Sequence, residues 1–197
     1  MTFDIIDAYK NAILKSDMVS EAEKEKLLLK LEKMDVNIGI PDEKFSSASV
    51  MHGGILESSI SIRKNAVEEN LSLYGTSVSH KWKMPSYAVN AYYSSQDNSI
   101  NIPLAMLNAP VFDTNAGYYE NLGKLGAVIA HEISHAFDSN GVKYDENGYY
   151  NPDWIGMYGK ERLKKVEKSF SEYFGNAKIM DVYKIDRELT LNENIAD

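Results

Sequence analysis

The chain has 197 residues, of which 44% are hydrophobic and 25% are charged, as in a globular protein with a buried core. Its formal net charge of −8 argues against a nucleic-acid backbone as partner, because proteins that bind nucleic acids carry basic patches. The absence of cysteine excludes disulfides and thiolate metal ligands, so only nitrogen and oxygen ligands remain for a metal site.

The N-terminal part of the sequence predicts two helices. Apolar residues recur with a helical period over residues 3–14. A capping box, in which Ser20 and Glu23 can bond each other's backbone N–H groups, begins a second helix with leucines in its interior. Gly39 and Pro41 are expected to end that helix, because glycine and proline stop helices.

A stretch rich in serine and glycine follows these helices. Residues 46–59 predict a loop, and residues 60–73 predict a weaker helix. Beyond them the pattern changes to β-forming residues. We therefore expect a helical segment of residues 1–75 that packs on a second segment of residues 76–197.

The second segment opens with a predicted β-hairpin. Residues 87–93 are rich in strand-forming residues, residues 96–99 have turn chemistry, and residues 99–102 form a second short strand that Pro103 ends. The amide of Asn90 could bind the backbone of an extended peptide that adds to an exposed strand edge. The alternative is an ordinary core hairpin in which this Asn faces a turn.

An HExxH motif lies in the next element, a predicted helix over residues 121–137. His131 and His135 are separated by four positions, so they share one face of the helix and can bind the same metal ion. Glu132 is then placed to act on a metal-bound water. The alternative is a chance match to a short motif, without zinc.

The remaining sequence predicts turns and two further helices. Residues 145–148 resemble part of a calcium-binding loop but lack its spacing and its final glutamate, so we expect no calcium there. Asn151 caps a helix that Gly175 closes. Thr190 or Asn192 could cap a last helix.

This last helix supplies a candidate for the third metal ligand. A site with two histidines needs one more protein ligand and an open position for water, and Glu193 is the best candidate. Asp197, four residues on, shares its helical face and can accept the free N–H of a ligand histidine; Asp138 is a second candidate for that role. The alternatives are that Asp138 is a solvated acid at a helix end and that Asp197 has no role.

Five segments of the chain resemble, in order, motifs of the neprilysin-type zinc endopeptidases, which form peptidase family M13 and include bacterial PepO-like members. The segments are residues 38–42, 89–93, 100–103, 128–138 and 191–197. The resemblance implies an α+β, mainly helical fold. It implies a zincin-like metallopeptidase catalytic segment in residues 76–197, with the HExxH helix and a small substrate-binding sheet or hairpin, and N-terminal packing helices in residues 1–75.

The resemblance also implies a metal site and a catalytic base. His131, His135 and Glu193 match the zinc ligands of the family, which implies one Zn²⁺ per chain. Glu132 matches the general base.

Further residues match positions around that site. Asp197 matches a catalytic acid that orients a ligand histidine, and Asp138 matches a second acid behind the motif. Asn90 and Ala91 match residues that hold the substrate backbone. The chain departs from the family at Asn192, where members often have glycine.

The function that this resemblance implies is a zinc-dependent endopeptidase for oligopeptides, in which Glu132 activates a zinc-bound water as the nucleophile. The alternative is an inactive zinc-binding fragment. Family members are several hundred residues long and carry a downstream His and Arg that have no counterpart here, so we expect an internal or C-terminal-region piece, truncated at its C-terminal end. A zinc hydrolase of non-peptide substrates is a third hypothesis.

The sequence gives weaker indications of the compartment and the partners of the protein. Residues 1–4 do not begin a signal peptide, and the apolar run before the motif is too short to span a bilayer. We expect a bacterial protein, cytoplasmic rather than extracellular, without a membrane segment in this chain. We also expect a monomer that binds oligopeptide substrates and no nucleic acid.

Overall fold

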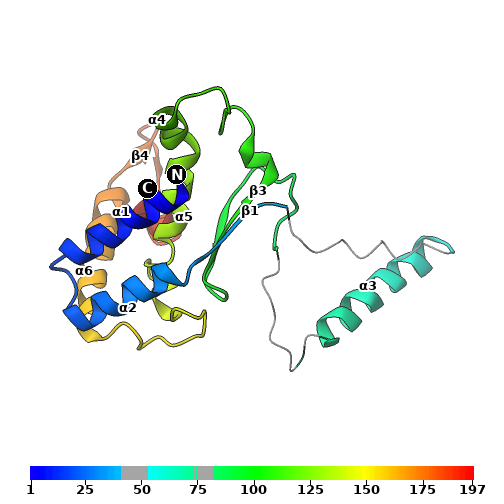
Figure 1. Ribbon diagram of the computed structural model, residues 1–197, viewed down its shortest axis with the longest axis horizontal. Helices are drawn as coiled ribbons and strands as arrows, with labels where there is room; N and C mark the ends of the chain where they lie inside the picture. Colours follow the sequence, from blue (N-terminus) through cyan, green and yellow to red (C-terminus); the bar gives the residue numbers. More distant parts are fainter. Residues whose placement is uncertain (41–52, 73, 75–81) are drawn as a thin grey trace. The chain divides into compact units, whose positions relative to one another are not determined.

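The computed structural model describes residues 1–40, 53–72, 74 and 82–197. Contacts divide the chain into two compact units, one of Met1–Gly39 with Ser86–Asp197 and one of Ile40–Pro85. The first unit contains the sheet and the HExxH motif, whereas α3 (Ile55–Ser72) belongs to the second (Figure 1). The predicted division into residues 1–75 and 76–197 stays a prediction.

Helix α3 begins earlier than the sequence predicted. Residues 55–59, which were expected in a loop, form its first turns, while residues 46–52 of that expected loop lie outside the described residues. Serine is compatible with a helix when its hydroxyl bonds back to a carbonyl one turn earlier, and Ser59 Oγ donates such a bond to the Ile55 carbonyl at 2.8 Å.

Three strands form the sheet of the first unit, in the order β1-β3-β2. The central strand β3 (Ser99–Pro103) is buried at every position. It pairs in parallel with β1 (Asp35–Gly39) and antiparallel with β2 (Tyr92–Ser94). The prediction that the second helix runs to Gly39 was therefore wrong, because β1 occupies the last part of that range. The predicted first strand of the hairpin also begins later, since β2 starts at Tyr92.

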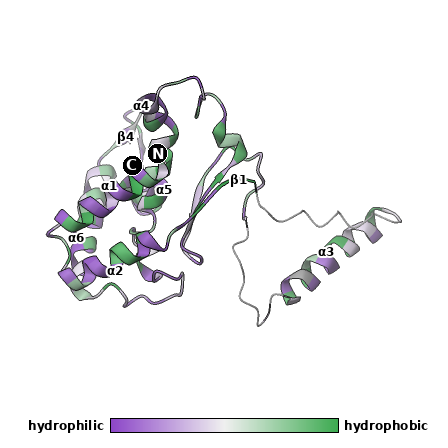
Figure 2. Ribbon diagram, viewed as in Figure 1, coloured by the Kyte–Doolittle hydropathy of each residue, from purple (hydrophilic) through white to green (hydrophobic). Residues whose placement is uncertain are grey.

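Two N-terminal helices, α1 (Thr2–Lys15) and α2 (Glu21–Glu32), carry hydrophobic and hydrophilic residues on different sides (Figure 2). The predicted capping box is present: Ser20 Oγ accepts the N–H of Glu23 at 3.4 Å, and the Glu23 carboxylate accepts the N–H of Ser20 at 2.8 Å. This exchange satisfies two donors that a helix start leaves free.

The HExxH motif lies in a helical segment that starts with α4 (Tyr118–Asn121) and a π-helical turn (Leu122–Gly126) and continues as α5 (Ala127–Ser134). Its apolar side packs in the main core with Ile100 and Ile102 of β3 and with Ile5 and Ile6 of α1. Burial of such side chains stabilises a fold by about 1.5–3 kcal/mol each. The motif helix is thus held by the sheet and by α1.

After the motif, α6 (Met157–Gly175) precedes a two-stranded ribbon and a last helix, α7 (Leu191–Ala196). Helix α6 starts later than predicted from Asn151, because Gly156 takes a positive φ of 90° directly before it. The other elements are the 3₁₀ turns η1 (Leu104–Leu107) and η3 (Gly141–Lys143) and the ribbon strands β4 (Lys178–Ile179) and β5 (Tyr183–Lys184).

The predicted architecture, mainly helical with a small sheet, is confirmed. In the part of the chain that the structure describes, none of the helices combines the length and the apolar character that a membrane span requires.

Candidate metal centre

The two motif histidines lie side by side at the end of α5. His135 is the residue after the helix, but its backbone keeps the α-helical conformation, with φ at −61°. The turn of the helix therefore brings both rings to the same face, and their Nε2 atoms are 3.1 Å apart.

Glu193 approaches this pair from α7, which lies 62 residues further along the chain. Its Oε2 atom is 3.1 Å from His131 Nε2 and 3.6 Å from His135 Nε2. Three atoms from two helices thus form a small triangle. The Glu193 side chain is 63% exposed, so the triangle is open to solvent on one side.

Each imidazole is oriented by a carboxylate on its other nitrogen. His131 Nδ1 is 2.8 Å from Asp197 Oδ1, and His135 Nδ1 is 2.8 Å from Asp138 Oδ2. A carboxylate can only accept, so each Nδ1 carries the hydrogen and each Nε2 presents a lone pair. The bond to Asp138 also raises the pKa of His135, although burial opposes this.

Asp138 is itself fixed by the backbone. Its side chain is buried, and Oδ1 accepts the N–H groups of Asn140 at 2.8 Å and Gly141 at 2.7 Å. The carboxylate therefore cannot turn away from His135 without losing both bonds. It is not the solvated helix-end acid of the alternative interpretation.

The triangle fits a zinc ion. Lone pairs on His131, His135 and Glu193 converge, and they repel one another unless a cation or a shared proton lies between them. Two ligand atoms about 2.0–2.1 Å from a tetrahedral zinc are about 3.3 Å apart, close to the spacings of 3.1, 3.1 and 3.6 Å found here. Two imidazoles and one carboxylate are also a ligand set that leaves a fourth position open.

Glu132 lies beside this triangle and is only 8% exposed. Burial raises its pKa, against the opposing effects of His135 and His131 and of a backbone hydrogen bond from Tyr93. That bond connects the side chain to the edge strand β2. A buried carboxylate with a raised pKa is suited to accept and return a proton.

Asn90 and Ala91 come directly before β2. The Asn90 side chain is exposed and its Oδ1 accepts the N–H of Ala91 at 2.9 Å, whereas Ala91 is buried. Their predicted part in holding a peptide backbone stays a prediction.

Two contacts that position this site could not be predicted from the sequence. Tyr9 of α1 donates its hydroxyl to the Ala130 carbonyl of α5 at 2.8 Å. Ser139 donates to Asn192 Oδ1 at 2.8 Å and so joins two segments that carry site residues. Both bonds link positions more than 50 residues apart, and no local pattern could have indicated them.

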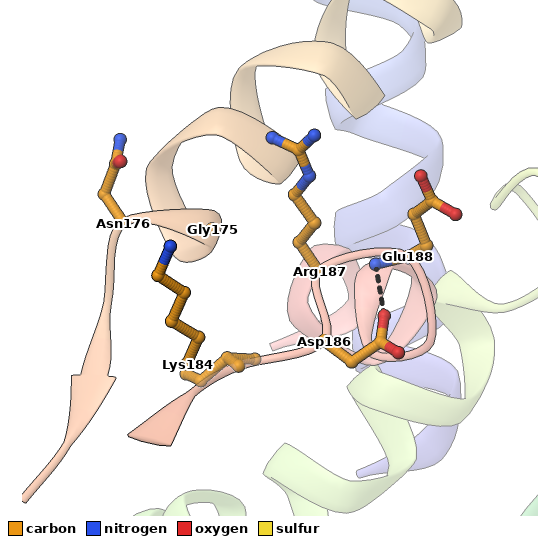
Figure 3. A pocket seen from close by; sticks show the side chains of 7 residues that line it. Gly175, Asn176, Lys184, Asp186, Arg187 and Glu188 are labelled. Carbon is orange, nitrogen blue, oxygen red and sulfur yellow. Dashed lines mark hydrogen bonds between the residues drawn. The ribbon is translucent and has the colours of Figure 1, made fainter. Parts of the chain in front are cut away.

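A polar pocket of 470 Å³ lies away from the metal centre, at the end of α6 and beside β5 (Figure 3). Lys184, Arg187 and Glu188 line it, and the N–H of Glu188 donates to Asp186 (Figure 3). None of the predicted site residues lines this pocket.

Comparison with known proteins gives consistent matches. Residues 90–197, more than half of the chain, match the model of peptidase family M13. A neutral endopeptidase of Lactococcus lactis is 31% identical over the whole chain and 32% of its own length.

Solved structures extend this likeness to the fold. A Mycobacterium tuberculosis zinc metalloprotease, solved with an inhibitor, has a TM-score of 0.87 and 28% identity over 99% of this chain and 31% of its own. PepO from Lactobacillus rhamnosis has a TM-score of 0.84 and 29% identity over the same share of each chain. These neighbours confirm the zincin-like fold. The chain spans about a third of the length of the curated relatives it matches.

Proposed function

Because the chain belongs to peptidase family M13, we propose that it forms the zinc-binding catalytic part of an endopeptidase that cleaves oligopeptides. The observation that carries the proposal is the convergence of His131, His135 and Glu193, each a ligand type that zinc prefers, with Glu132 beside them. The names of relatives, which include a neutral endopeptidase and a zinc metalloprotease, support the same reaction.

The residues divide the chemistry among them. His131, His135 and Glu193 would hold the zinc, with Asp197 and Asp138 keeping the imidazoles in the ligating tautomer. A zinc ion bound there would polarise the scissile carbonyl and lower the pKa of water toward about 7.

Glu132 moves the proton. Its carboxylate would take a proton from the attacking water and deliver it to the leaving amine, a role to which a raised pKa is suited. Water as nucleophile requires no covalent intermediate with the protein.

Substrate binding is assigned to the exposed edge of the sheet. Among the strands that the structure describes, β2 is an edge strand next to β3, and an edge strand can pair with an extended peptide. Asn90, exposed at the start of that edge, would bond the peptide backbone, with Ala91 beside it.

Metal analysis tests the metal centre. We expect one zinc per chain in the wild type and a clear loss of zinc in Glu193→Ala. An unchanged zinc content in that variant would remove Glu193 from the ligand set.

A second candidate function is a zinc-binding segment without activity of its own, which is favoured by the chain's span of about a third of its relatives. A quenched peptide assay, with and without chelator, on this chain and on the full-length protein separates the two. Turnover by the chain that chelator abolishes supports the endopeptidase. Zinc binding without turnover by the chain, beside turnover by the full-length protein, supports the second candidate.

A further inference from the structure

We propose that Asn192 is a positioning residue: it accepts a hydrogen bond from Ser139 and thereby holds Glu193 at the metal centre. The inference rests on the proposed zinc site and goes beyond it, because neither residue is a metal ligand. It concerns how the third ligand, which comes from a separate helix, is brought to the two histidines of α5.

Helix α7 contacts α5 and α6, but none of its own residues is buried there. It is six residues long. Glu193 and Asp197 have side chains that are 63% and 78% exposed. A helix of this length is not stable by itself, so its place depends on contacts with the rest of the fold.

The polar contacts that join α7 to α5 and to the segment after α5 are of two kinds. Glu193 and Asp197 both approach His131, but these contacts are part of the metal centre and change when a cation binds. The bond from Ser139 Oγ to Asn192 Oδ1, at 2.8 Å, does not involve a ligand or an orienting acid. It can therefore hold the helix before a metal arrives.

The sequence positions of the two partners give this bond its effect. Ser139 directly follows Asp138, which orients His135, and Asn192 directly precedes Glu193. The bond thus joins the segment behind the second ligand to the segment that carries the third. Both partners are half-buried, so water competes only partly for the bond.

A double-mutant cycle on zinc affinity tests the proposal. The variants are Asn192→Ala, Ser139→Ala and the double variant, with zinc affinity measured by competition with a chromophoric chelator. We expect each single variant to weaken zinc binding about five-fold, as the loss of one hydrogen bond predicts, and the double variant to be no weaker than either. Ser139→Thr retains the hydroxyl and should restore wild-type affinity.

Thermal unfolding of the zinc-free chain separates positioning from a general structural role. Alanine favours helices, and Asn192 is only half-buried, so Asn192→Ala should leave the zinc-free melting temperature unchanged. The alanine variants could instead lower the free energy of unfolding of the zinc-free chain by as much as they lower the free energy of zinc binding. If Ser139→Thr does not restore that stability, the role is merely structural and the proposal is overturned. Additive effects of the two substitutions would overturn it as well.

His131→Ala keeps the two proposals distinguishable. If the wild type binds zinc and His131→Ala does not, while Asn192→Ala binds it as tightly as the wild type, only the positioning role is refuted. If the wild type itself binds no zinc, the proposed function fails, and the positioning role fails with it.

Discussion

Glu132 combines two properties that seldom occur together in a side chain, a charge and burial. Its side chain is only 8% exposed, and this burial raises its pKa. The neighbouring His135 and His131 and the backbone of Tyr93 act in the opposite direction and lower its pKa. These features distinguish the role of Glu132 from that of Glu193, which is largely exposed.

Glu132→Gln separates proton transfer from metal binding. Glutamine has the same shape and can still accept the bond from Tyr93, but it cannot take up a proton. We expect zinc content to remain at the wild-type value and peptidase activity of the full-length protein to fall at least about 100-fold. The matched control, Glu188→Gln, changes an exposed acid at the separate pocket (Figure 3) and should leave activity unchanged. Full activity in Glu132→Gln would refute the assigned base.

The residues of this centre differ in how well the sequence predicts their positions. The helical spacing of His131 and His135 places their rings on one face, so their proximity follows from local geometry. Glu193 lies 62 residues from His131, so no local geometry joins them; the need for a third ligand and the resemblance to a family indicated it. Asn192 stands where members of that family often have glycine, and its side chain makes a long-range bond that no sequence pattern indicates.

At the scale of elements, the turn after α5 depends on a glycine. An ideal Cβ at Gly141 would lie 1.9 Å from the carbonyl oxygen of His135 and 2.6 Å from the carbonyl carbon of Ala136. Backbone atoms cannot yield as a flexible side chain can. This close approach lets the Gly141 N–H reach Asp138.

Gly141→Ala should therefore push this turn away from α5. We expect the free energy of unfolding to fall by about 3 kcal/mol or more, because the clash is with backbone. Zinc binding should weaken too, since Asp138 loses a bond that fixes it. Gly123→Ala is the control, because its added Cβ meets nothing within 4 Å. Its free energy of unfolding, measured in urea, should not fall and should rise by up to about 1 kcal/mol.

The elements that the sequence predicts well are those with local patterns. Helices α1 and α2 follow from apolar periodicity and a capping box, and the hairpin strand β3 follows from its strand-forming residues. Strand β1 was missed because its parallel pairing with β3 joins distant residues, as in Val36 with Ile100. Its alternating Val36 and Ile38 were too short a pattern to outweigh the helix before them.

At the scale of the whole molecule, one buried cation joins α2 to the segment behind the metal centre. Lys30 is fully buried, and its Nζ donates to the carbonyls of Gly141 at 2.7 Å and Tyr144 at 2.6 Å. It also lies 5.1 Å from the centre of the Trp154 ring. Burial lowers the pKa of Lys30 to about 8, although nearby acids oppose this.

Lys30 gives the stability of the fold a pH dependence of known sign. The folded chain releases this proton near pH 8, whereas the unfolded chain keeps it to about pH 10.4. In that window the unfolded state binds more protons, so the contribution of Lys30 to stability rises with pH. Lys30→Met lacks this group. Between about pH 7.5 and about pH 10, the free energy of unfolding of the wild type, measured in urea, should therefore rise by about 2 kcal/mol relative to that of the variant. Parallel curves for the two proteins would contradict the lowered pKa.

The two compact units should respond differently to zinc. All three proposed zinc ligands belong to the unit of Met1–Gly39 and Ser86–Asp197, whereas α3 belongs to the other. A ligand that binds only the folded form stabilises the cooperative unit that holds it, by about 2.7 kcal/mol at 100 times its dissociation constant. Zinc should therefore slow amide hydrogen exchange about 100-fold in the most protected amides of α5, where exchange requires unfolding of that unit.

Exchange in α3 should not respond to zinc, because none of the three proposed ligands belongs to its unit. His131→Ala is the matched control, in which zinc should slow exchange in neither helix. Equal slowing in α3 and α5 of the wild type would show that the two units unfold together. The units defined by contacts would then not unfold independently.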